Sequence, residues 1–166
     1  MRLTRFLGDT SGGPASEMAL LLPLLITLLF VCFEGGYFLW NEHKVVKGVR
    51  DGARYAGRLS FTDYDCSDSS VDSAAETSIN NLTRTGQLSG GTPVIPGWTD
   101  SGVTVSVACQ TEDGIYTANS NNAPVVTVSA LVPYPSSPLT ELAGVLGFNV
   151  GSIHLRAAAE SPVVGL

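Results

Sequence analysis

The chain has 166 residues, enough for one membrane-spanning segment and one globular domain. Its charge is unevenly distributed: residues 1–58 contain seven of the nine Lys and Arg, whereas residues 59–166 contain two basic and ten acidic residues, a formal charge of −8. Because so acidic a region repels phosphate backbones, its charge argues against nucleic acid as a partner.

The chain is organised around an apolar run at residues 18–40, in which Thr27 and Glu34 are the polar residues. A helix needs about 20 apolar residues to cross a bilayer core. A removable signal peptide would have a shorter apolar region followed by a small-x-small site, and here the bulky Tyr37 and Trp40 follow instead. We therefore expect a retained transmembrane helix, with a secreted protein cut before Tyr37 as the less favoured alternative.

The helix is predicted to continue beyond the membrane, over residues 15–58, because small and apolar residues recur at helical spacing between positions 45 and 57. Gly48, Gly52 and Ala56 are four residues apart and share one helical face. Small residues in such a row let another backbone approach closely. The face could contact the chain's own globular domain or pack against another subunit, and the sequence leaves both uses open.

Residues 59–166 have the pattern of a small α+β domain. A modest helix is predicted over residues 71–88 and a short one over 137–147, where Ser137 can cap the first turn. Alternating residues predict strands near 103–108, 125–134 and 152–159. The expected fold is one long N-terminal helix followed by a small antiparallel sheet with one or two short helices.

The cysteines and histidines suggest no catalytic or metal site. Cys32 lies inside the apolar run, and Cys66 and Cys109 should form a disulfide if the C-terminal domain lies outside the cytoplasm. His43 and His154 belong to no nucleophile motif, and metal-ligand spacings and nucleotide-binding loops are missing from the sequence. We therefore expect a protein that is not an enzyme and has no cofactor, metal or small-molecule substrate.

Glu17 stands at the N-terminal edge of the apolar run, where a carboxylate needs a partner or water. Its negative charge could simply be stabilised by the positive N-terminal end of the helix dipole. If the chain is cut between Gly12 and Gly13, however, Glu17 becomes the fifth residue of the mature protein. The new amine could then neutralise the carboxylate, within one chain or between neighbouring subunits, and guide one helix into register with the next.

Three separated blocks resemble a known family: GGPASEMALLLP at residues 12–23, EGG at 34–36 and DGARYA at 51–56. Their order and spacing are similar to those of TadE-like proteins, the minor pilins or pseudopilins of tight-adherence (Tad) systems, over about residues 12–58. The resemblance implies cleavage by a prepilin peptidase after Gly12 and an assembly role for Glu17. It also implies storage in the bacterial inner membrane and a part in starting or supporting a Flp-type pilus, with other Tad subunits and assembly-platform proteins as partners.

The resulting domain plan has a cytoplasmic leader at residues 1–12, a long helix at 13–58 and an extracytoplasmic α+β domain at 59–166. Counted naively, the basic residues between positions 44 and 58 would place that flank in the cytoplasm. We expect the opposite orientation because of the cysteine pair and the family resemblance. The alternative function is a membrane-anchored extracytoplasmic binding or sensory domain with no pilus role.

Overall fold

The computed structural model describes residues 13–145, 147 and 153–165. The chain divides into two compact units, Met1–Tyr37 and Phe38–Leu166, each of which is considered separately below. The predicted leader at residues 1–12, including Gly12 of the predicted cleavage site, lies outside the described residues.

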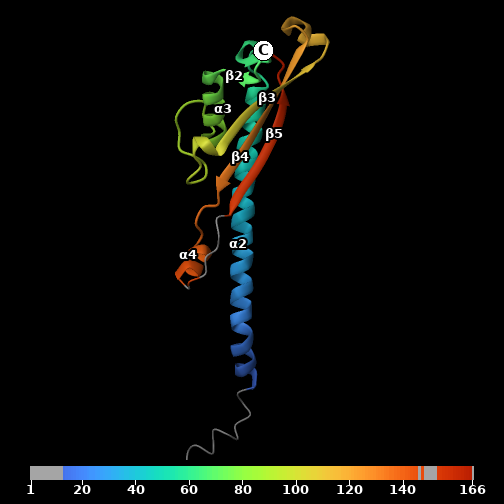
Figure 1. The fold of residues 1–166 in the computed structure, drawn as a ribbon. Helices are drawn as coiled ribbons and strands as arrows, with labels where there is room; N and C mark the ends of the chain where they lie inside the picture. Colours follow the sequence, from blue (N-terminus) through green and yellow to red (C-terminus); the bar gives the residue numbers. More distant parts are fainter. Residues whose placement is uncertain (1–12, 146, 148–152, 166) are drawn as a thin grey trace, which may run out of the picture. The chain divides into compact units, whose positions relative to one another are not determined.

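The long predicted helix is confirmed as α2, Gly13–Ala56 (Figure 1). Pro23 lies inside α2 and has no backbone N–H to donate. Its carbonyl oxygen accepts a hydrogen bond from the Thr27 hydroxyl at 2.8 Å. Side chains at positions 15–33 are exposed, as expected of a segment whose partner is lipid. By length and composition, α2 is the one helix among the described residues that could cross a membrane.

The second unit contains a three-stranded antiparallel sheet in the order β3-β4-β5. Its strands are β3 (Val103–Thr111), β4 (Asn122–Pro133) and β5 (His154–Pro162). All three predicted strands are confirmed, and in β4 the buried positions alternate with less buried ones from Pro124 onward, as the period-two pattern requires. Residues 60–72 contain a short helix η2 (Phe61–Asp63) and a small hairpin of β1 (Tyr64–Asp65) and β2 (Ser70–Val71).

Two further helices, one before β3 and one between β4 and β5, belong to the second unit. The helix predicted over 71–88 is shorter, α3 (Ser73–Thr85), because Asp72 caps its first turn and Gly86 takes a left-handed conformation at its end, φ 75°. The short helix predicted over 137–147 is α4 (Pro138–Val145), and Ser137 caps it as expected: its Oγ accepts from Thr140 N at 3.2 Å. Helices η3 (Asp100–Gly102) and η4 (Gly114–Asn119) are the remaining elements of the described residues.

The core of the second unit forms between the end of α2, the sheet and α3. Val45, Val49 and Ala53 lie on one face of α2 and are almost fully buried, which confirms the apolar face predicted from helical spacing. The same cluster includes residues from the sheet, from α3 and from the loop before β3, among them Val126, Val128, Val132, Ile79, Ile95 and Trp98. The α+β fold class expected from the sequence is confirmed.

Candidate functional site: the long helix and its docking to the α+β unit

Gly48 and Gly52 lie where α2 meets α3. A Cβ atom on Gly48 would collide with the Thr83 carbonyl oxygen, and one on Gly52 would collide with Thr83 Oγ1. Only glycine permits an approach this close. Of the two uses left open for this face, contact with the chain's own domain is the one the structure shows, and packing against another subunit stays an untested prediction.

Ala56, the third residue of that face, is fully buried in the core at the end of α2. The hydroxyl of Tyr64 donates a 2.6 Å hydrogen bond to the Ala56 carbonyl oxygen, which also accepts a 3.2 Å hydrogen bond from Leu59 N, just beyond the helix. Burial, followed by the negative charge of Asp63 and the nearby Tyr55, raises the pKa of Tyr64 well above its ordinary value. Tyr64 therefore stays neutral and caps the helix.

Thr83 is a buried polar residue that the sequence analysis missed. Its hydroxyl donates to the Ile79 carbonyl oxygen at 2.7 Å, so the polar group is satisfied within α3 while its surface meets Gly52. A signal for it existed: Thr83 is four residues from Ile79, on the face of α3 that the helical period turns inward.

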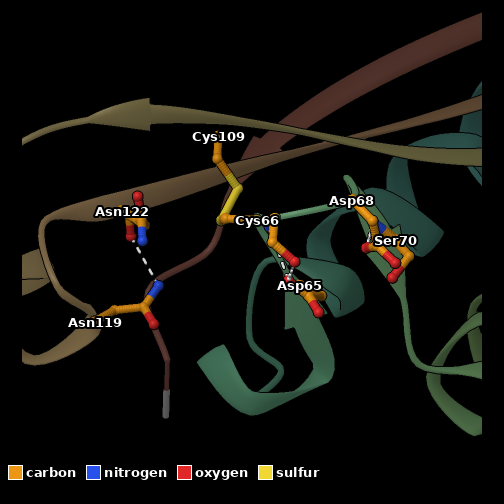
Figure 2. Close-up of a disulfide and its surroundings, with 8 residues drawn as sticks. Asp65, Cys66, Asp68, Ser70, Cys109, Asn119 and Asn122 are labelled. Atoms are coloured by element: carbon orange, nitrogen blue, oxygen red, sulfur yellow. Dashed lines mark hydrogen bonds between the residues drawn. A yellow bond between two sulfur atoms is a disulfide. The ribbon is translucent and has the colours of Figure 1, made fainter.

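The predicted disulfide is present between Cys66, in the β1–β2 turn, and Cys109 on β3, with a Cα–Cα distance of 5.7 Å (Figure 2). The turn beside it is ordered by its own side chains. The Ser67 hydroxyl and amide both donate to the Asp65 carboxylate, at 2.6 and 2.8 Å, and lower its pKa. Cys32 is a free, exposed cysteine on α2.

Glu17, the residue assigned an assembly role from the sequence, lies on the exposed surface of α2, one helical turn beyond Gly13. Within the described part of the chain, Glu17 has no hydrogen-bond or ion-pair partner. Gly13, on the C-terminal side of the predicted cleavage point, belongs to α2 and is the first residue that the structure describes.

Aromatic side chains mark the end of the apolar run inside the second unit. Trp40 is 64% exposed, and the Lys44 amine lies 5.6 Å from its ring centroid. The Phe38 ring lies 5.6 Å from the ring of Tyr134, just after β4. This arrangement fixes which end of the sheet lies beside the aromatic residues that terminate the apolar run.

The described residues contain no group of three or more His, Cys, Asp or Glu that could hold a metal ion. His43 is exposed on α2, and His154 is exposed at the start of β5. The features that remain are an apolar helix, a small-residue contact and a disulfide, all of which serve anchoring and packing. The helix fits a single-pass membrane anchor by its length and composition, and an α+β domain follows it in the chain.

The sequence model of the TadE-like protein family matches residues 14–54, in agreement with the resemblance found from the sequence blocks. This match covers nearly all of α2 and none of the sheet, so the likeness belongs to the helix. No curated protein and no solved structure matches the chain. Over its long helix, this protein is therefore similar to TadE-like proteins.

Proposed function

We propose that the protein is a minor pilin or pseudopilin of a Tad system that supports assembly of a Flp-type pilus. In this proposal a prepilin peptidase hydrolyses the Gly12–Gly13 peptide bond on the cytoplasmic side of the inner membrane. The mature subunit then starts at Gly13, is held in the membrane by α2 and joins or supports the pilus through contacts with other Tad subunits and the assembly platform.

The observation that carries the proposal is the family match at residues 14–54, which begins directly after Gly12-Gly13 and includes Glu17. A general membrane anchor needs apolar length but no paired glycine and no carboxylate at a set distance from it. A carboxylate in lipid is costly and is typically retained for a function. The position of Glu17 therefore favours a processed, assembling subunit over a plain tether.

Cleavage would create the partner that Glu17 needs. Hydrolysis leaves a free amine on Gly13, four residues and about 6 Å along the helix axis from Glu17. A protonated amine and a carboxylate attract strongly where water is scarce. The two groups would therefore neutralise each other's charge, within one chain or between adjacent chains. Pairing between chains would set the register of neighbouring helices.

The Cys66–Cys109 disulfide supports an extracytoplasmic location for the α+β unit, because structural disulfides persist in oxidising compartments. In the proposed orientation the N-terminus faces the cytoplasm and the peptidase, and the C-terminal unit faces the periplasm or the exterior. The acidic charge of residues 59–166 suits a soluble surface there.

The proposal is tested by the Glu17→Gln substitution in the producing cells. It should abolish or strongly reduce pilus formation while the protein still accumulates in the inner membrane, because the neutral amide keeps the shape and loses the charge. Glu76→Gln, on the exposed side of α3, is the matched control and should leave piliation unchanged. Normal piliation with Glu17→Gln would refute the pairing role.

A further inference from the structure

We propose that α4 (Pro138–Val145) and Ile153, the residue before β5, lie on the bilayer surface and form a second, interfacial contact with the membrane. This inference rests on membrane anchoring by α2 and is independent of any role in a pilus. It assigns a lipid partner to a part of the chain that lies outside the family match at residues 14–54.

Exposed apolar side chains on this segment are the first observation. Val145, at the end of α4, is 84% exposed, and Ile153, just before β5, is 42% exposed. Glu141 is the one charged residue among the eight of α4. Interfacial helices bury exposed apolar side chains such as those of Val145 and Ile153 at the boundary between headgroups and acyl chains, and the single charge of α4 favours this placement.

The position of this segment in the second unit is the second observation. The chain leaves β4 through Tyr134, whose ring lies 5.6 Å from that of Phe38. Phe38 lies two residues, about 3 Å of helix rise, before Trp40, the exposed aromatic at the end of the apolar run. Trp residues favour the membrane–water interface, so the connection to α4 starts at the level of that interface.

The opposite end of the sheet provides a contrast within the same unit. β4 has 12 residues and spans about 40 Å, and the β3–β4 connection with η4 lies at its other end (Figure 1). Ile115 in η4 is also exposed, at 58%, but it is separated from Tyr134 by the length of the strand. Exposure alone therefore does not distinguish the two sites. The end of the sheet does: Tyr134 N donates to the Ile153 carbonyl oxygen at 2.9 Å, so α4 leaves and rejoins the sheet beside the Tyr134–Phe38 contact.

The chemistry favours lipid acyl chains over charged headgroups as the recognised feature. The described residues of α4 include no basic side chain that could pair with a phosphate, and Glu141 would be repelled by an anionic surface. The contact should therefore form on a zwitterionic bilayer and need no anionic lipid.

The test uses the full chain reconstituted in phosphatidylcholine vesicles, with Cys32→Ser to remove the free thiol and the disulfide left intact. An environment-sensitive fluorophore is attached at Val145→Cys or, as the matched control, at Ile115→Cys. Nitroxide-labelled acyl chains are then added to the vesicles. We expect a blue shift and a loss of emission at position 145, and neither change at position 115.

Equal emission behaviour at the two positions, quenched or unquenched, would overturn the proposal. Quenching at position 145 that appears only after anionic lipid is added would overturn it too, because it would show charge and not apolar burial. The vesicles contain no peptidase and no other subunit, so the result does not depend on the proposed pilus function.

Discussion

At the residue scale, the contact between Gly52 and Thr83 determines how closely α2 and α3 approach. Glycine inside a helix costs about 1 kcal/mol relative to alanine, so two glycines four residues apart need a reason in packing. The reason is visible in the structure, because Thr83 occupies the space that a side chain at either position would take.

Gly52→Ala should destabilise the second unit by about 1–3 kcal/mol, the usual cost of overpacking, despite the better helix propensity of alanine. Chemical denaturation of the detergent-solubilised protein measures the change. In a Thr83→Ala background the cost of Gly52→Ala should shrink, because the obstructing hydroxyl is gone. Additive effects of the two substitutions would contradict the contact.

Tyr64→Phe should cost about 1 kcal/mol of unfolding free energy, because the Ala56 carbonyl oxygen loses the shorter of its two hydrogen bonds and keeps the one from Leu59 N. Tyr116→Phe is the control, since no hydrogen bond of the Tyr116 hydroxyl occurs among the described residues. Thermal unfolding followed by circular dichroism compares the two. A Tyr64→Phe protein as stable as the control would rule out the capping role.

Tyr64 also predicts a dependence on alkaline pH. Its pKa is raised in the folded state, chiefly by burial, so below the ordinary value of 10.0 the group is neutral in both states and its contribution is fully present. Above that value the unfolded chain releases the proton first, and the stability falls as pH rises. Tyr64→Phe should flatten this fall between pH 10 and 12, and an identical slope in both proteins would argue against it.

At the scale of elements, α3 begins after the capping residue Asp72 and ends at Gly86. The Asp72 carboxylate accepts hydrogen bonds from Ala74 N at 2.9 Å and Ala75 N at 3.3 Å. Asp72→Ala should therefore cost about 1 kcal/mol, while Asp72→Asn, an equally good cap, should cost little. Urea denaturation would distinguish them, and equal losses in the two variants would show that charge rather than capping matters.

The Cys66–Cys109 disulfide connects the β1–β2 hairpin to β3 across 43 residues that include α3. Replacing both cysteines with serine should destabilise the unit by about 4 kcal/mol on the loop-entropy estimate for a closure of this length. Unfolding of the oxidised protein and of the double variant gives the difference. Equal stability would mean that the bridge does not constrain the unfolded chain.

Elements with a clear period were predictable from the sequence, and those defined by tertiary contacts were not. The apolar run and the spacing of Val45, Val49 and Ala53 predicted α2, and alternation predicted the three strands. Ile95 and Trp98 lie in a glycine- and proline-rich stretch that reads as a turn, yet both are buried. The burial of Ile95 and Trp98 depends on residues distant in the sequence that pack around them, and a local sequence pattern does not indicate those residues.

The candidate site was predictable in part for the same reason. The disulfide followed from two cysteines in one domain, and the small-residue face from a spacing of four. Which surface that face contacts could not be predicted, because the sequence does not specify the partner of a small-residue row. Thr83 was missed because a threonine is not an apolar residue, so only its position four residues after Ile79 marked it as part of the buried face of α3.

At the scale of the whole molecule, the chain combines an apolar helix with an acidic α+β unit stabilised by its own core and a disulfide. The match to the TadE-like family covers residues 14–54 of the helix and does not extend into the sheet. In the proposed function the helix supplies anchoring and register, and the α+β unit supplies the surface that other subunits or the exterior meet.

The central claim is that the chain is a processed, pilin-like subunit, and the intact mass and N-terminal sequence of the protein from its native membranes test it most directly. Strains with and without the prepilin peptidase should be compared. We predict a mature chain that starts at Gly13 only when the peptidase is present. A chain that starts at Met1 in both strains would contradict the claim and favour a plain membrane-anchored domain.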